Sequence, residues 1–297
     1  MTEKLIKEWN IESTPVQIYH SAWDINNSYV LKVYDDPTTL QRNIVMMQTL
    51  YEAGIPVPKI IKLPDGRDYS ENGKEFYILT TKLKGKNIVN LNECDDRWFF
   101  EFGTILAKLH IAFQTCEEHI SCWNGSILEE MNGWVSENFS KFKVEYLEMN
   151  DIKDSINELA EVYDDLPKQL IHRDVHLGNF LFDDGVFSGY IDFDLSQSNI
   201  RIFDLCYFLL GLLLEGDNNR VEEERWYEII RQVIKGYDSI AILLDVERNA
   251  IICVMQNIEL LFTAYFLGTG DEKSAKGSAD LFSFVKRNKE KIQDALI

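Results

Sequence analysis

The stretch IHRDVHLGNFLFDDGVFSGYIDFD, in the second half of the chain, combines acids, an amide and turn residues in an informative order. Asp174 is followed five residues later by Asn179, and Asp192 stands near the end of the stretch. Two short β-rich runs, 179–182 and 186–193, flank an Asp-Asp-Gly turn. Such a turn predicts a hairpin, which would return Asp192 to the neighbourhood of the first two side chains.

Phosphoryl transfer from ATP requires this set of groups. One carboxylate orients and deprotonates the attacking hydroxyl, while a neutral amide oxygen and a second carboxylate hold Mg²⁺ on the phosphates. Oxygen ligands suit Mg²⁺, which takes few protein ligands and keeps several waters. The alternative is an acidic hairpin with a solvated turn, which leaves the coincident spacings unexplained.

The segment from His172 to Asn179 (HRD-x4-N) resembles the catalytic loop of the aminoglycoside phosphotransferase and choline kinase superfamily, whose members share the protein-kinase architecture. The IDFD segment resembles its metal-binding segment, with Asp194 where protein kinases have Gly. The resemblance implies that Asp174 is the catalytic base and that Asn179 and Asp192 are metal ligands. It also implies ATP and Mg²⁺ as cofactors.

The same resemblance implies an α+β fold: a bilobal protein-kinase-like fold with a small β-rich N-lobe and a larger, mainly helical C-lobe. We expect residues 1–81 to form the N-terminal nucleotide-binding lobe and residues 82–88 the hinge. Residues 89–297 would form the helical C-terminal lobe with the catalytic loop and the substrate site.

Composition narrows the class of protein. The 297 residues are 45% hydrophobic, as in ordinary globular proteins, and include no unbroken run of 18 apolar residues, so no membrane span is expected. The N-terminus MTEKLIKEWN is charged and lacks an apolar signal core, which favours a cytoplasmic protein. The scattered cysteines favour reduced thiols. They are Cys94, Cys116, Cys122, Cys206 and Cys253.

The net charge of −19 argues against nucleic acid as a partner, because its phosphates require a basic face. A small cationic substrate would suit this charge through long-range attraction. A solubilising acidic surface with no bearing on the substrate explains the charge equally simply, and we favour it. The sequence does not define an oligomeric state.

Residues 15–34 predict a β-hairpin whose second strand, YVLKVY, contains Lys32. By resemblance Lys32 reaches the α- and β-phosphates, whereas the alternative is a lysine that faces water. A helix is predicted over 37–53. Turn signals follow at 64–66 and 71–73, and a sheet edge is predicted between and after them, ending in 76–81. Thr80 and Thr81 lead into the expected hinge. Because hinge backbone groups bind adenine in kinase-like folds, the resemblance implies that these two residues belong to the nucleotide site.

Two features depart from the family pattern. No glycine precedes Gly54, so the glycine-rich phosphate loop is missing, and we expect the backbone around Ser13 and Thr14 to take its place. The helix over 37–53 lacks a carboxylate before Glu52, although the lysine-pairing Glu of protein kinases is expected near Asn43. Either the lysine is held in another way, or the register of the helix is shifted by one turn, or the activity is weak.

The rest of the chain reads as mainly helical. Apolar spacing predicts helices from residue 94 onward, a core helix over 205–214, and further helices over 225–243, 247–267 and 278–296. Asp204 is expected to receive backbone N–H groups of the catalytic loop, and Arg173 to pair with Asp194 or a neighbour. His110 is expected to be a buried, structural imidazole. His176 could contact phosphate or cap the turn, and we favour the cap. A trio of Cys116, His119 and Cys122 does not have the spacing of a zinc site.

We therefore expect a small-molecule kinase that transfers the γ-phosphate of ATP to a hydroxyl group. The resemblance suggests aminoglycosides, choline or ethanolamine, homoserine, methylthioribose and other sugars as substrates. Acids that could receive a cation are Glu215, Asp217, Glu259 and Asp271. The alternative is a non-catalytic nucleotide-binding regulatory protein on the same fold. The presence of all three motif residues, Asp174, Asn179 and Asp192, argues against this alternative. The short interval between Asp192 and Asp204 disfavours a protein kinase.

Overall fold

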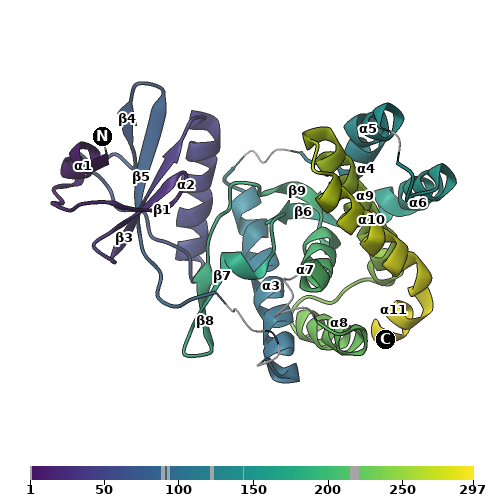
Figure 1. Cartoon of the computed structure of the whole chain (residues 1–297). Coiled ribbons are helices and arrows are strands. Elements are labelled where there is room, and N and C mark those ends of the chain that lie inside the picture. Colours follow the sequence, from purple (N-terminus) through teal and green to yellow (C-terminus); the bar gives the residue numbers. More distant parts are fainter. Residues whose placement is uncertain (1, 88–90, 92–93, 121–123, 143, 215–220) are drawn as a thin grey trace. The chain divides into compact units, whose positions relative to one another are not determined.

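The computed structural model describes residues 2–87, 91, 94–120, 124–142, 144–214 and 221–297 (Figure 1). The chain divides into two compact units. Unit 1 consists of Met1–Ile88, Gln114–Cys122 and Leu177–Asp194, and unit 2 of Val89–Phe113, Trp123–His176 and Leu195–Ile297. Asn179 and Asp192 therefore belong to unit 1 together with Lys32, whereas Asp174 belongs to unit 2.

Unit 1 is built on an antiparallel sheet with the strand order β1-β2-β3-β5-β4. The strands are β1 (Val16–Tyr19), β2 (Ala22–Ile25), β3 (Tyr29–Tyr34), β4 (Ser70–Asn72) and β5 (Glu75–Thr81). The two-stranded hairpin predicted over 15–34 is in fact three strands. Ile25, which was assigned to the turn, is fully buried and belongs to β2. The sheet edge predicted between and after the turns at 64–66 and 71–73 is present: β4 is the outer strand, and β5, which contains the predicted end of this edge at 76–81, lies between β3 and β4.

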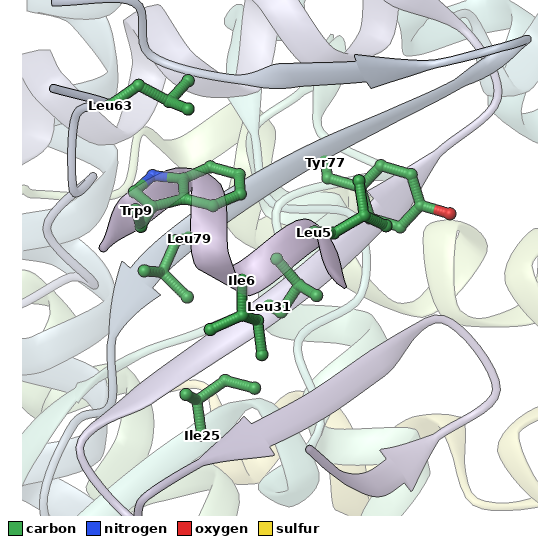
Figure 2. Packing of buried hydrophobic residues seen from close by; sticks show 8 residues of the cluster. All are labelled: Leu5, Ile6, Trp9, Ile25, Leu31, Leu63, Tyr77 and Leu79. Atoms are coloured by element: carbon green, nitrogen blue, oxygen red, sulfur yellow. The ribbon is translucent and has the colours of Figure 1, made fainter. Parts of the chain in front are cut away.

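The core of unit 1 lies between this sheet and the N-terminal helices α1 (Thr2–Ile6) and η1 (Lys7–Trp9) (Figure 2). The Trp9 indole N–H donates to the carbonyl of Ile61 at 2.8 Å, which anchors the helices. On β3 the fully buried Leu31 belongs to this cluster. Because successive strand residues point to opposite faces, its neighbour Lys32 is directed away from the cluster.

Helix α2 (Pro37–Glu52) confirms the helix predicted over 37–53. It begins after Asp36, whose carboxylate accepts the backbone N–H groups of Thr38 and Thr39 at 3.2 and 2.8 Å. Such a cap satisfies donors that have no partner within the helix, and proline is well suited to the first helical position. The sequence thus determines where α2 starts, and with it the position of Asn43.

The predicted hairpin of the motif stretch is present as β7 (Phe180–Asp183) and β8 (Val186–Tyr190). Its turn has positive φ at Asp184 (49°) and Gly185 (79°), as tight hairpin turns require. A short helix, η5 (Leu177–Asn179), leads into it. Reciprocal backbone hydrogen bonds of 2.9 Å between Lys86 and Phe182 tie the hairpin to the first 88 residues.

Unit 2 is mainly helical and contains one small antiparallel ladder, β6 (Lys168–Ile171) with β9 (Gln197–Ile200). The predicted last helix is two helices separated at Asn288. The other helices predicted in this part are present. The helices are α3 (Asp96–Glu117, whose last turn is grouped with unit 1), α4 (Ile127–Glu130), η3 (Met131–Val135), α5 (Ser136–Lys141), α6 (Met149–Val162), η4 (Tyr163–Asp165), α7 (Ile202–Leu214), α8 (Glu223–Asp238), α9 (Asp245–Thr269), α10 (Glu272–Arg287) and α11 (Lys289–Ala295).

Helix α9 is long and apolar enough to cross a membrane by length and composition, with a mean hydropathy of 1.7. However, 72% of its apolar window is buried inside the structure, where α9 packs against α6, α7 and α10. A buried core helix meets the same criteria as a membrane span. The burial therefore favours α9 as a core helix of unit 2.

Two glycines bring α3 and α8 into close contact. A Cβ atom at Gly236 would overlap the carbonyl oxygen of Phe100, and a Cβ atom at Gly103 would overlap that of Val233. Phe102 of α3 also stacks on Phe208 of α7, with ring centroids 3.7 Å apart. These contacts fix α3, which carries His110, against α7 and α8.

We expect Gly236→Ala to lower the free energy of unfolding by about 2 kcal/mol or more, because the methyl group must push the two backbones apart. The control is Gly277→Ala in α10, where no atom lies within 4 Å of the added Cβ. That change should be neutral or stabilising by up to about 1 kcal/mol, since alanine is the better helix former. Urea unfolding of both variants measures the difference, and equal stabilities would contradict the close-packing role of Gly236.

Candidate active site

Lys32 of β3 is paired with two carboxylates of the segment that follows β8. Its Nζ lies 2.9 Å from Oδ1 of Asp192 and 2.6 Å from Oδ2 of Asp194. Burial alone would lower the pKa of Lys32, but electrostatic interactions with Tyr34, Asp194 and Asp192 outweigh it and raise the pKa above its ordinary value. Lys32 is therefore cationic at neutral pH, and its side chain is only 21% exposed, which speaks against a lysine that merely faces water.

Asn43 of α2 occupies the position where a lysine-pairing Glu was expected, and it contacts the carboxylate that pairs with the lysine. Its Nδ2 donates to Oδ1 of Asp194 at 2.7 Å, and the Tyr34 hydroxyl donates to the same oxygen at 3.1 Å. The guanidinium of Arg42 donates to the Asp194 backbone carbonyl at 3.0 Å. The lysine is thus held by Asp194 and Asp192, and α2 holds Asp194 through neutral and cationic donors.

The β7–β8 hairpin brings Asn179 and Asp192 to adjacent positions in unit 1. The N–H of Ile191 donates to the carbonyl of Asn179 at 3.0 Å, and Asp192 follows directly. Asp192 has a left-handed φ of 65°, a conformation that costs a non-glycine residue about 1 kcal/mol or more. The surrounding hydrogen bonds therefore impose this geometry on Asp192.

The donor set at this position fits Mg²⁺. A carboxylate and an amide supply oxygen ligands, and Mg²⁺ typically takes one or two protein carboxylates and completes its octahedron with phosphate oxygens and water. Among the described residues, no group of three or more His, Cys, Asp or Glu side chains could hold a metal. Phosphate oxygens and water would complete the coordination of a metal held by Asn179 and Asp192.

Thr80 and Thr81 end β5, and their polar groups are engaged within unit 1. The Thr81 N–H donates to the carbonyl of Lys59 at 2.8 Å, and its hydroxyl accepts the Lys59 N–H at 2.9 Å. The next N–H, that of Lys82, donates to the carbonyl of Ser28 at 2.9 Å. An adenine ring at the predicted hinge would have to meet other backbone groups of this segment, and Ile88 at its end lies outside the described residues.

Ser13 and Thr14, expected near the phosphates, lie before β1. The Ser13 hydroxyl donates to Oδ1 of Asn26 at 2.7 Å, at the β2–β3 turn. The β1–β2 turn is at the opposite end of β2, where Ala22 pairs with Lys32. Sequence reasoning missed this turn, which contains His20 and Ser21, because Asp24 and Ile25 of β2 were assigned to the turn of a two-stranded hairpin and no glycine marks the β1–β2 turn.

In unit 2, Asp174 accepts hydrogen bonds from neighbouring side chains on both oxygens. The Tyr207 hydroxyl donates to Oδ1 at 3.1 Å, and Nε2 of His176 lies 3.5 Å from Oδ2. Burial would raise the pKa of Asp174, but His176, His172 and Tyr207 outweigh it and hold the pKa below its ordinary range. Asp174 is therefore an ionised carboxylate at neutral pH. No sequence pattern predicted the contact with Tyr207, which comes from a helix that follows the motif.

The backbone next to Asp174 is held by Asp204 at the start of α7. Its two carboxylate oxygens accept the N–H groups of His172 and Arg173, each at 2.8 Å, as the resemblance implied. Nε2 of His110 lies 3.0 Å from the same carboxylate, and Nδ1 of His110 lies 2.7 Å from the Tyr237 hydroxyl. The prediction that His110 is structural agrees with this buried network.

The partner expected for Arg173, Asp194 or a neighbour, is corrected to Glu130 of unit 2. The Arg173 guanidinium donates to both carboxylate oxygens of Glu130, at 2.8 and 3.0 Å. Arg173 also has a left-handed φ of 67°. A bidentate pair of this kind fixes the planar guanidinium, and together with Asp204 it stabilises the strained backbone before Asp174.

Of the acids named as cation receptors, Glu259 and Asp271 lie in the described part of the chain. Burial raises the pKa of Glu259 to about 8, so this side chain of α9 is mostly uncharged at neutral pH. Asp271 caps α10 and accepts the N–H of Ser274 at 3.1 Å. Glu215 and Asp217 lie outside the described residues. Of the trio considered for a metal, Cys116 is buried in α3 and Cys122 is outside the described residues.

The family comparison agrees with this geometry. The model of the APH family, described as phosphotransferase enzyme family, matches residues 16–243. The chain belongs to this family. The family assignment confirms the predicted class of activity, an ATP-dependent phosphotransferase acting on a small molecule, and favours an enzyme over a binding-only protein.

Curated relatives include the homoserine kinase of Zymomonas mobilis subsp. mobilis (strain ATCC 31821 / ZM4 / CP4), which is 25% identical over 79% of this chain and 72% of its own length. The homoserine kinase of Gluconacetobacter diazotrophicus (strain ATCC 49037 / DSM 5601 / CCUG 37298 / CIP 103539 / LMG 7603 / PAl5) is 26% identical over 75% of this chain and 68% of its own length.

Solved structures confirm the predicted kinase-like α+β fold. A microcompartment-associated aminopropanol kinase matches all of this chain and 98% of its own with a TM-score of 0.71 and 15% identity. An amicoumacin kinase in complex with AMP-PNP, Ca²⁺ and Ami matches 95% of this chain and 87% of its own with a TM-score of 0.67 and 18% identity.

We expect Asp204→Asn to lower the free energy of unfolding by about 2–4 kcal/mol, because an amide group would face backbone donors in a fully buried position. The matched control is Glu101→Gln in the exposed pair with Arg97, which should change stability by less than about 1 kcal/mol. Thermal and urea unfolding measure both. A variant as stable as the control would show that Asp204 does not hold the loop.

Proposed function

We propose that this chain is a kinase that transfers the γ-phosphoryl group of ATP to a hydroxyl of a small amino-containing alcohol, with homoserine as the first candidate. The observation that carries the proposal is the ionised Asp174 on a loop whose backbone is fixed by Asp204. A base must be ionised and held within hydrogen-bond reach of the hydroxyl it activates. The family assignment supplies the reaction class.

Asp174 acts as the catalytic base. Its carboxylate orients the substrate hydroxyl and accepts the proton as the oxygen attacks the γ-phosphorus in line. Because the pKa of Asp174 is held below its ordinary range, the carboxylate is available at neutral pH without prior loss of a proton. His172 and Arg173, whose N–H groups donate to Asp204, keep the loop in place.

Lys32 binds the α- and β-phosphates of the nucleotide. It is cationic and largely buried, and it is anchored by Asp194, which Asn43 and Tyr34 hold in turn. The β1–β2 turn with His20 and Ser21 adjoins Lys32 through the Ala22–Lys32 pair and takes the place of the missing glycine-rich loop. Backbone groups of the 82–88 segment, together with Thr80 and Thr81, are proposed to line the adenine site.

Asn179 and Asp192 are proposed to bind Mg²⁺ through their side-chain oxygens. The metal would neutralise negative charge on the β- and γ-phosphates. Asp192 also pairs with Lys32 at 2.9 Å, so nucleotide and metal binding would have to redistribute this ion pair.

Homoserine is favoured because this chain matches two curated homoserine kinases over more than two thirds of their length. An amino-containing substrate also agrees with the net charge of −19, which attracts cations. Other amino alcohols are the second candidate, since the aminopropanol kinase has the same fold over the entire chain. We propose a cytoplasmic location, where ATP is plentiful.

The decisive experiment measures ADP release from Mg-ATP with homoserine, amino alcohols, choline, aminoglycosides and sugars. We expect one amino-containing alcohol to stimulate release, and Asp174→Asn to reduce kcat by at least about a hundredfold while ATP still binds. Turnover that persists in Asp174→Asn would remove Asp174 as the base. Failure to bind ATP would overturn the proposal altogether.

Lys32→Ala is expected to weaken ATP binding by about tenfold or more, since it removes the buried cation that faces the phosphates. The matched control is Lys62→Ala, which removes an exposed lysine of unit 1 whose side chain is 59% exposed. Isothermal titration with ATP and Mg²⁺ measures both. If the two variants bind ATP equally well, Lys32 does not contact the nucleotide.

A further inference from the structure

One side of α7 contacts the catalytic loop at consecutive points. The Phe203 ring lies under the Arg173 guanidinium, 5.7 Å from its centroid. Asp204 accepts the backbone N–H groups, and one turn later the Tyr207 hydroxyl donates to Oδ1 of Asp174 at 3.1 Å. Residues three apart on a helix lie on the same side, so a single helix holds both the backbone and the side chain of the loop.

The Tyr207 ring is itself held by stacking. It stacks on Phe203 with centroids 6.1 Å apart and planes at 16°, and it lies 5.6 Å from the Phe262 ring of α9 at 30°. Burial, followed by the negative charge of Asp174, raises the pKa of Tyr207 well above its ordinary value. The hydroxyl therefore keeps its proton and remains a donor throughout the physiological range.

We propose that Tyr207 is a positioning residue for Asp174: its hydroxyl fixes the carboxylate in one rotamer and keeps it ionised for proton abstraction. This inference rests on the proposed function, in which Asp174 is the base. A hydrogen bond to the charged form of an acid favours that form, so loss of the hydroxyl should make Asp174 easier to protonate.

In the described part of the chain, the titratable groups that act on this pair are two histidines and two acids. His176 and His172 act on Asp174, and Glu259 and Asp204 act on Tyr207 from α9 and the start of α7. The histidines favour the ionised carboxylate only while they are protonated. Tyr207 donates in the same way on either side of their titration, which makes it the pH-independent partner of Asp174.

The first test does not require the substrate. The carboxyl ¹³C signal of Asp174, identified by its absence in Asp174→Asn, is titrated in the wild-type protein and in Tyr207→Phe. We expect the pKa of Asp174 to rise by about one unit in Tyr207→Phe. An unchanged pKa would overturn the proposal.

The second test uses the stimulating substrate. We expect Tyr207→Phe to lower kcat by about tenfold, to leave KM for ATP unchanged, and to move the acid limb of the kcat profile to higher pH. Tyr265→Phe, which removes the hydroxyl of a 51% exposed tyrosine of α9, should match the wild type in every measurement.

The outcomes separate the two proposals. A pKa shift in Tyr207→Phe with wild-type kcat would show that the hydrogen bond exists but does not serve catalysis, which overturns the positioning role. Turnover retained in Asp174→Asn would refute the proposed base and, with it, the catalytic part of this inference, whereas the titration would still report on the contact itself.

Discussion

The buried carboxylate of Asp204 is the interaction on which the candidate catalytic loop depends. It is fully buried, and such a charge is tolerated only when donors surround it. The N–H groups of His172 and Arg173 and the imidazole of His110 supply them. His110 is in turn fixed by Tyr237 of α8, and its carbonyl accepts the side-chain amide of Gln169. Helices α3, α7 and α8 and strand β6 therefore converge on one carboxylate. Arg173 adopts a left-handed conformation that this convergence can impose and an isolated loop could not hold.

Electrostatics in unit 1 follow a different principle. A chain with a net charge of −19 would repel a nucleotide unless cations were placed at its phosphates. Lys32 is such a cation, and its charge is secured by Asp192 and Asp194 against the burial that would otherwise lower its pKa. The helix α2 contributes no carboxylate to this arrangement. Asn43 instead donates to Asp194, so that the acid contacting the lysine comes from the motif segment itself. Lys32, Asp192 and Asp194 are thus in contact within unit 1. The uncharged amide of Asn43 stabilises this group by its hydrogen bond to Asp194.

The sequence predicted what depends on local spacing. The hairpin between Asn179 and Asp192, the helix after Asp36 and the acceptor role of Asp204 follow from turn residues, a cap and a motif. Prediction from the sequence failed where tertiary packing determines the structure. Ile25 is buried in a strand of its own, although its neighbours Asn26 and Asn27 resemble a turn, so β2 was missed together with the β1–β2 turn. Arg173 pairs with Glu130, which belongs to the same unit but is distant in sequence. No local sequence pattern predicts this pair. Glu259 resembles a surface acid in sequence, whereas burial on α9 leaves it mostly uncharged.

The packing of α7 in the hydrophobic core determines the position of the candidate catalytic loop. Most residues of this helix are buried, including Leu205, Cys206, Phe208 and Leu209. A rotation that moved Tyr207 away from Asp174 would also turn these apolar side chains out of their packing, and close-packed interiors resist such shifts because each displaced group loses contacts. The hydroxyl of Tyr207 and the carboxylate of Asp204 are thus positioned with the accuracy of the hydrophobic core, although neither is apolar. Since the free energy that fixes them comes from the core, catalytic geometry and stability are coupled in α7: substitutions in its buried positions should disturb Asp174 before they unfold the chain.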